Sequence, residues 1–165
     1  MRVLVSVGTD HHPFDRLVDW AERWAVAHPE DSVVVQHGTT RAPSGVEHAE
    51  LYSRDEMRAQ LERADVVVIS CGPGGVMDVR STGRVPVVLA RRADLGEHVD
   101  DHQQSFARHL SHAGLAHCIE TEDALASALD SARTEPERWR CEPPSEPPAG
   151  IARIGELIDE LVWST

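Results

Sequence analysis

The sequence contains no lysine, and all 16 of its basic residues are arginines. Acidic residues number 28, so the formal net charge is −12 at pH 7. A protein that binds nucleic acid needs a basic face for the phosphates, so this balance argues against such a partner. The same deficit of positive charge argues against direct docking on anionic lipid.

Cysteines and long apolar runs are also scarce. The three cysteines, Cys71, Cys118 and Cys141, are scattered and form no C-x-x-C pair, as expected of a reduced, cytoplasmic protein. Residues 1–5 lead directly into a predicted strand, without the long apolar core of a signal peptide. No apolar run approaches the roughly 20 residues that span a bilayer, so we expect no direct membrane insertion.

The 165 residues suit one main domain in which strands and helices alternate. The predicted strands cover residues 2–7, 32–36, 66–69, 85–90 and 117–120, with a further edge strand near residues 51–52. The predicted helices cover residues 14–28, 54–63, 76–83, 100–113 and 122–133, and Thr121 is the expected N-cap of the last. This alternation predicts a Rossmann-like α/β fold, a parallel sheet with helices on both faces. Its strand-to-helix loops gather at one edge, where ligands bind.

The C-terminal part follows a different pattern. Residues 1–141 form the predicted domain, and the proline-rich residues 142–150 form a stiff linker. Residues 151–165 then predict an amphipathic helix. Its apolar stripe suits docking on a partner protein or packing back on its own domain, and the sequence leaves both open.

A strand, a glycine-rich turn and a helix start follow one another in residues 64–78. The turn contains Gly72, Pro73, Gly74 and Gly75, and the helix is expected from Val76. Unpaired amides and the helix dipole favour an anion there, and glycine lets a phosphate approach closely. Asp78 lies one turn further, within reach of a sugar hydroxyl. A tight turn that packing requires is the alternative.

Two polar clusters follow other predicted strands. Residues 97–104 (EHVDDHQQ) crowd a junction between a loop and a helix and suit either the reading of sugar hydroxyls or a capped helix start. Residues 8–12 (GTDHH) follow the first strand and lack the dinucleotide fingerprint, so NAD binding is not expected. Adjacent histidines converge poorly on one ion and no third ligand stands out, so no metal is expected. Cys71 suits a small buried residue better than a nucleophile.

Taken together, these segments resemble the glycosyltransferase family 28 C-terminal domain over roughly residues 2–125. The resemblance is strongest to its small single-domain members, which include the cytosolic subunit of the dolichol-linked UDP-GlcNAc transferase and bacterial exopolysaccharide glycosyltransferase subunits. The segments that carry it are Val5-Ser6-Val7-Gly8-Thr9, Pro13-Phe14-Asp15-Arg16-Leu17-Val18, Ala64-Asp65, Gly72-x-Gly74-Gly75-Val76-Met77-Asp78, Gly83-x-Val85-Pro86-Val87-Val88 and Asp101-His102-Gln103-Gln104.

The resemblance implies the C-terminal, donor-binding half of a GT-B fold, which uses a UDP-sugar as substrate and needs no cofactor. It implies that residues 72–76 hold the diphosphate and that Asp78 bonds the ribose. Gln103, with Asp100, His102 or Gln104 beside it, would read the donor sugar, and Gly8 and Thr9 would face the cleft. The catalytic residue is not identified, and His11 and His12 are weak candidates for it.

The family also implies a separate, membrane-associated subunit that binds a lipid-linked or polysaccharide acceptor. The expected activity is therefore that of an inverting hexosyltransferase subunit, active with its partner and cytoplasmic, with a place at the inner face of the membrane left open. Two departures favour a non-catalytic or stabilising subunit as the alternative. Ser70-Cys71 replaces a frequent His-Ala, and Gly75 replaces a serine or threonine.

Overall fold

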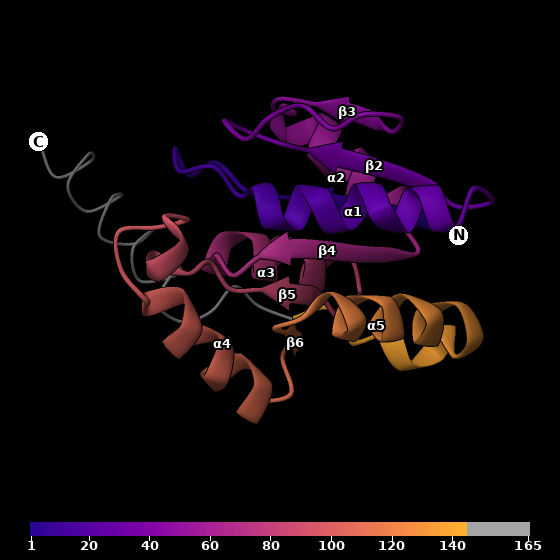
Figure 1. Ribbon diagram of the computed structural model, residues 1–165. Helices are drawn as coiled ribbons and strands as arrows, with labels where there is room; N and C mark the ends of the chain where they lie inside the picture. The colour runs from indigo at the N-terminus through magenta and orange to yellow at the C-terminus, as the bar shows by residue number, and fades with distance from the viewer. Residues whose placement is uncertain (145–165) are drawn as a thin grey trace, which may run out of the picture.

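A computed structural model describes residues 1–144, and these form a six-stranded, fully parallel sheet between two layers of helices (Figure 1). The strand order is β3-β2-β1-β4-β5-β6. The first three strands build one half of the sheet and the last three build the other half, and the two halves meet between β1 and β4. The strands are β1 (Arg2–Ser6), β2 (Ser32–Gln36), β3 (Glu47–Ala49), β4 (Val66–Ser70), β5 (Val87–Leu89) and β6 (His117–Ile119). This order is the doubly wound arrangement of Rossmann-like folds, which confirms the predicted fold class.

Of the described helices, four link strands that follow one another in the chain and the fifth follows β6, while a loop joins β2 to β3. They are α1 (Asp15–Ala27), α2 (Arg54–Arg63), α3 (Pro73–Ser81), α4 (His102–His112) and α5 (Glu122–Thr134), with 3-10 turns η1 (Ala93–Leu95) and η2 (Pro136–Trp139). The expected N-cap of α5 is confirmed, since the Thr121 side chain accepts a hydrogen bond from the Ala124 N–H.

Two predicted boundaries are wrong by three residues or more, and the others differ from the structure by at most two. Helix α3 begins at Pro73 instead of Val76, because proline at the first helical position has its φ already set and has no N–H to leave unpaired. The edge strand is Glu47–Ala49 instead of residues 51–52, because these three residues pair with Val34–Gln36 of β2. The glycine-rich segment is therefore mostly the first turn of a helix.

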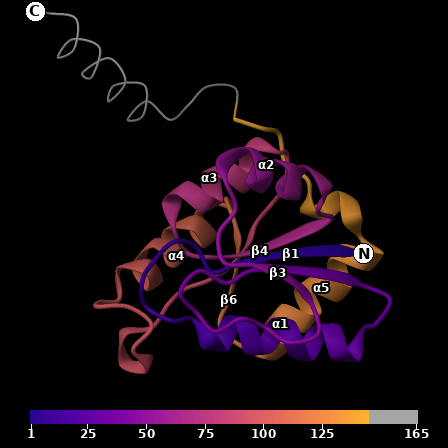
Figure 2. The same ribbon diagram turned by 90° about the horizontal axis from the view of Figure 1, so that it is seen from above.

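Each face of the sheet is covered by its own helices, as the view from above shows (Figure 2). Alternate residues of the strands point to opposite faces. Val3 and Val5 of β1 pack toward α1 and α5, whereas Leu4 packs toward the layer of α2, α3 and α4. Both faces are thus closed to water along most of their length, and the open edge is the one where the strands end.

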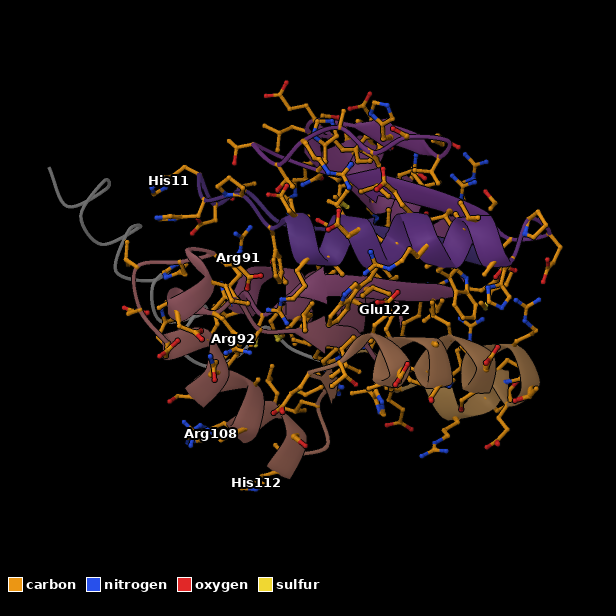
Figure 3. The ribbon with its side chains drawn as sticks, in the orientation of Figure 1. His11, Arg91, Arg92, Arg108, His112 and Glu122 are labelled. Carbon is orange, nitrogen blue, oxygen red and sulfur yellow. The ribbon has the colours of Figure 1, made fainter. Side chains whose placement is uncertain are left out.

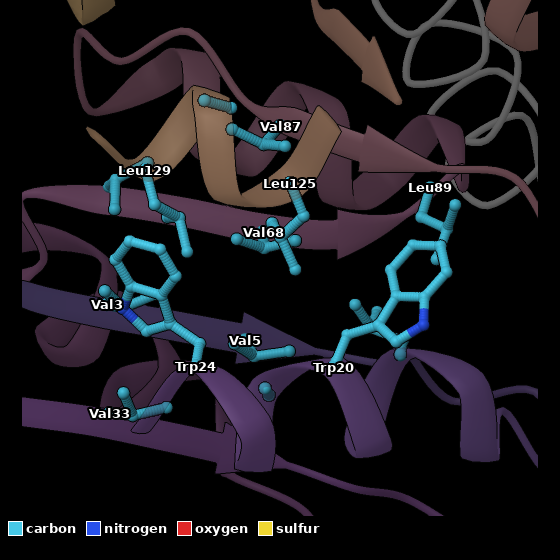
Figure 4. Packing of buried hydrophobic residues seen from close by; sticks show 14 of the residues in the cluster. Val3, Val5, Trp20, Trp24, Val33, Val68, Val87, Leu89, Leu125 and Leu129 are labelled. Carbon is cyan, nitrogen blue, oxygen red and sulfur yellow. The ribbon is translucent and has the colours of Figure 1, made fainter. Parts of the chain in front are cut away.

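Few aromatic residues serve this core, but they are placed centrally. Trp24 of α1 packs near Val3 of β1 and Leu129 of α5, and Trp20 packs near Leu89 of β5 (Figure 4). Such large rings bury much apolar area each, so α1 and α5 are held firmly on one face.

The predicted C-terminal helix, residues 151–165, lies outside the described residues, as does most of the predicted linker. Within residues 1–144, no helix has the length and apolar character that crossing a membrane demands.

Candidate functional site

The carboxyl ends of β1 and β4 border a cavity of about 620 Å³ at the open edge of the sheet. This is the point where the strand order reverses, and open α/β sheets bind ligands at such a switch point. Its lining comes from β1, β4 and the segments that follow them, from the loop before α2 and α2 itself, and from residues after β5. The lining includes Gly8, Thr9, Asp10, Leu51, Tyr52, Met57, Ser70, Gly72, Gly74, Gly75, Asp78, Arg91 and Gln103.

The start of α3 forms one wall of this cavity. Gly72 is extended at the N-cap position and its residue type offers no capping side chain. Because Pro73 has no N–H, Gly74 and Gly75 carry the first helical amides that lack a partner within the helix. A Cβ built on Gly72 or Gly74 would have no atom within 4 Å, so a ligand can approach this backbone freely. The wall is suited to an anionic group.

The turn after β1 lines the cavity beside this wall and depends on one glycine. Gly8 has a φ of 81°, and a Cβ there would stand 2.9 Å from the Ser70 Oγ. Gln36 donates to the Gly8 carbonyl at 3.5 Å, and the Ser6 Oγ accepts from the Gly8 N–H at 3.3 Å. Glycine at this position therefore lets the ends of β1 and β4 approach each other closely.

Arg91, which the sequence analysis missed, connects the segment after β1 to the segment after β5 through hydrogen bonds. Its side chain is fully buried, and its guanidinium donates to the carbonyls of Val7 at 2.9 Å, His12 at 2.7 Å and Glu97 at 2.9 Å. The group also lies 4.6 Å from the centroid of the Phe14 ring. Burial lowers the pKa of Arg91, and the nearby carboxylates of Asp10 and Glu97 oppose that shift.

A second arginine completes this support. Glu97 is buried and accepts from Arg16 at 2.8 and 2.6 Å, and its Oε2 also accepts from the Arg92 N–H at 2.9 Å. Arg16 extends from α1, so the pair holds the loop after β5 against that helix. Figure 3 shows Arg91 inside the molecule and Arg92 near the loop that leads to α4.

The structure brings together most, but not all, of the predicted site residues. Those that line the cavity are Gly8, Thr9, Gly72, Gly74, Gly75, Asp78 and Gln103. The Gln103 Oε1 also accepts from the Arg91 N–H at 3.2 Å, which fixes its position. Pro73, Val76, Asp100, His102 and Gln104 do not line it.

The reasons for these exclusions differ. Val76 packs in the core beneath α3, whereas Gln104 faces a separate cavity of about 510 Å³ beside α4. Asp100 and His102 are exposed and pair with each other at the start of α4. Successive side chains on a helix point about 100° apart, and here Gln103 lines the first cavity whereas Gln104 lines the second.

Cys71 is buried beside this site, and burial raises the pKa of its thiol to about 12. The thiol therefore stays protonated at neutral pH and is not a nucleophile. This confirms the interpretation of Cys71 as a small core residue.

The family model for the glycosyltransferase family 28 C-terminal domain matches residues 2–154. The chain belongs to this family. The match extends beyond the residues 2–125 on which the resemblance was noted, and it confirms that resemblance. No curated protein sequence matches the chain.

Three solved structures place this family 28 domain among glycosyltransferase folds. The glycotransferase of kitacinnamycin is 24% identical with a TM-score of 0.61, and the match covers 83% of this chain and 36% of that one. ALG13 is 16% identical with a TM-score of 0.58, covering 93% of both chains. MurG of Acinetobacter baumannii is 18% identical with a TM-score of 0.54, covering 84% and 42%.

These lengths have a direct consequence for the family 28 domain. It spans well under half of two of these proteins but nearly all of ALG13. At such identities the likeness shows the shared fold alone. The fold is that of the C-terminal half of a GT-B enzyme, as predicted.

Proposed function

We propose that this family 28 domain is the donor-binding subunit of an inverting glycosyltransferase that uses a UDP-sugar, UDP-GlcNAc or a related hexose donor. The observation that carries the proposal is one cavity in which two helix-start amides, of Gly74 and Gly75, lie beside the Asp78 carboxylate and an apolar region. A nucleoside diphosphate sugar offers matching groups: a charged diphosphate, a ribose with hydroxyls and a flat base.

Each part of the donor has a plausible place in the cavity. The amides of Gly74 and Gly75 and the dipole of α3 favour the diphosphate. Asp78, one turn further along α3, is placed to accept from ribose hydroxyls. The apolar lining of Leu51, Tyr52 and Met57 suits the base, since flat rings bury well against such side chains.

The hexose then extends toward Thr9 and Gln103 in the same cavity. In the proposed reaction an acceptor hydroxyl attacks C1 of the sugar from the face opposite the diphosphate. The bond from C1 to the diphosphate oxygen breaks, and the amides stabilise the negative charge on the departing UDP. A preorganised helix start performs this stabilisation without a metal ion at the donor.

The acceptor and the base belong to a second subunit in this proposal, which is membrane-associated and binds a lipid-linked or polysaccharide acceptor. The chain itself is then cytoplasmic and reaches the membrane through that partner. His11 and His12 remain weak candidates for the base. The His12 Nδ1 lies 2.7 Å from an Asp10 carboxylate oxygen, while the His11 ring is largely exposed.

Calorimetric titration with UDP and UDP-GlcNAc tests donor binding. The wild-type chain should bind both, and Asp78→Asn should weaken binding about 10- to 100-fold, because a charged hydrogen bond is worth ~1.5–3 kcal/mol. Asp130→Asn, an exposed carboxylate on α5, is the matched control and should leave affinity unchanged. Absence of wild-type binding, with the partner subunit present, would refute the proposal.

Substitution of Gly75 gives a second test, in which the affinity for UDP is expected to rise. A Cβ there would lie 3.4 Å from the Ile69 Cδ1, an ordinary contact, so a small side chain fits. Gly75→Ser would add a hydroxyl beside the diphosphate and should tighten UDP binding about 2- to 10-fold, as expected of one hydrogen bond worth ~0.5–1.5 kcal/mol. Gly75→Ala, which adds the Cβ alone, should show no such gain. Equal affinities for the two variants would contradict the placement of the diphosphate.

The alternative function is a non-catalytic subunit that binds a nucleotide-sugar or stabilises another transferase. The absence of a side-chain hydroxyl at Gly75 favours it. Turnover of radiolabelled UDP-sugar by the reconstituted pair of subunits separates the two functions, since only the first predicts that Asp78→Asn lowers the rate.

A further inference from the structure

Three imidazole nitrogens approach the carboxylate of Asp10. The Nδ1 atoms of His12 and His11 lie 2.7 and 3.9 Å from its Oδ1, and the Nε2 of His98 lies 3.1 Å from its Oδ2. The sequence argued against a metal ion here because adjacent histidines converge poorly on one ion and no third ligand stood out. The fold supplies that ligand from a loop 86 residues away along the chain.

The approach of these groups is built into two loops. One loop follows β1 and contains Asp10, and the other follows β5 and contains His98. Arg91 holds them together from beneath, since it donates to the carbonyls of both His12 and Glu97. The cluster therefore rests on a buried frame, although His11 itself extends outward (Figure 3).

The donor set indicates the class of ion. Three imidazole nitrogens with one carboxylate suit zinc and similar transition metals, whereas magnesium and calcium prefer oxygen ligands. Ligand atoms around tetrahedral zinc lie about 3.3 Å apart, given metal–nitrogen distances of ~2.0–2.1 Å. The His12 and His11 nitrogens lie 2.7 and 3.9 Å from the Asp10 Oδ1, on either side of that value, and the His98 nitrogen lies 3.1 Å from the other oxygen, Oδ2.

The second ring nitrogen of His98 is held by the segment that follows it. Its Nδ1 accepts from the Asp100 N–H at 3.4 Å, whereas the Asp100 Oδ1, at 3.6 Å, is too far for a hydrogen bond. His98, Asp100 and His102 have ligand atoms within 4.8 Å of one another, as have Asp10, His11 and His12.

We propose that Asp10, His11, His12 and His98 bind one zinc-class transition-metal ion that joins the loop after β1 to the loop after β5. The site lies at the rim of the donor cavity, which Asp10 also lines. The ion is a clamp between the loops, and its binding does not depend on the function proposed above.

Zinc titration of the full chain tests this clamp. The protein is purified without a polyhistidine tag, stripped with chelator and titrated with zinc chloride by calorimetry, without nucleotide. One ion per chain should bind with a dissociation constant of about 1 µM or lower. His98→Gln and His12→Gln should each weaken binding at least about 10-fold, since even outer partners of a metal contribute 10- to 100-fold. His112→Gln, at the far end of α4, should bind as the wild type does.

Cobalt gives a readout that does not need the variants to fold. Wild-type protein loaded with Co²⁺ should show the intense visible absorption of tetrahedral coordination, and excess Zn²⁺ should abolish it. Lack of one-to-one zinc binding by the wild type, a weak octahedral cobalt spectrum, or unchanged affinity in both glutamine variants would each overturn the proposal. Because no nucleotide is present, these outcomes are distinct from failure of UDP-sugar binding.

Discussion

Replacing Arg91 by alanine is expected to lower the free energy of unfolding by about 3–5 kcal/mol. The guanidinium satisfies the carbonyls of Val7, His12 and Glu97 in the protein interior. Its removal leaves these acceptors buried and unpaired, at about 1–3 kcal/mol each, with partial relaxation by entering water. Urea denaturation followed by circular dichroism measures the change.

The neighbouring residue provides the control. Arg92 is exposed and pairs with Asp94, so Arg92→Ala should leave the denaturation midpoint within experimental error. Both variants remove one arginine and the same formal charge, and only one removes a buried network. Equal midpoints for the two variants would show that the carbonyl contacts of Arg91 contribute little to stability.

Gly74→Ala is expected to weaken binding of UDP and UDP-GlcNAc about 100-fold while slightly stabilising the protein. A Cβ at Gly74 meets no protein atom within 4 Å, so the fold accepts it, but it occupies space through which the diphosphate would reach the amides. Loss of one or two charged hydrogen bonds costs ~1.5–3 kcal/mol each. Alanine within a helix is better than glycine by ~0.5–1 kcal/mol, so the free energy of unfolding should rise.

Misfolding would lower both the affinity and the free energy of unfolding, so it cannot produce a loss of affinity together with a gain in stability. Calorimetry gives the affinity, and urea denaturation of the same samples gives the stability. Ser81→Ala, at the other end of α3, is the control that should leave the affinity unchanged. If the Gly74→Ala variant binds UDP as tightly as the wild type does, the diphosphate does not bind at this helix start.

Much of the fold was predictable because its signals are local. Strand β2 and helix α2 were predicted with the observed bounds, the first as a short buried run and the second from Met57 and Leu61, which share one face among charged residues. The Ser53 and Glu56 side chains form a complete capping box, which explains why α2 begins where it does. The start of α3 was placed three residues too late, because a run of glycine and proline is also typical of a turn.

The candidate site was predictable only in part. Glycines after a buried strand indicate close approach of a ligand to the backbone, and that pattern located one wall of the cavity. It did not show which of Gln103 and Gln104 faces the cavity, since their side chains diverge around α4. Arg91 could have been suspected from its place directly after a predicted buried strand.

The order of residues thus specified the alternating strands and helices, the glycine-rich helix start and the membership of family 28. Patterns of hydrophobicity and backbone conformation act over a few residues, so they can be read along the chain. The strand order, the burial of Arg91 and the meeting of Asp10 with His98 depend on contacts between distant segments. Such contacts form when the sheet assembles and brings the strand ends to one edge, and no local pattern encodes that geometry.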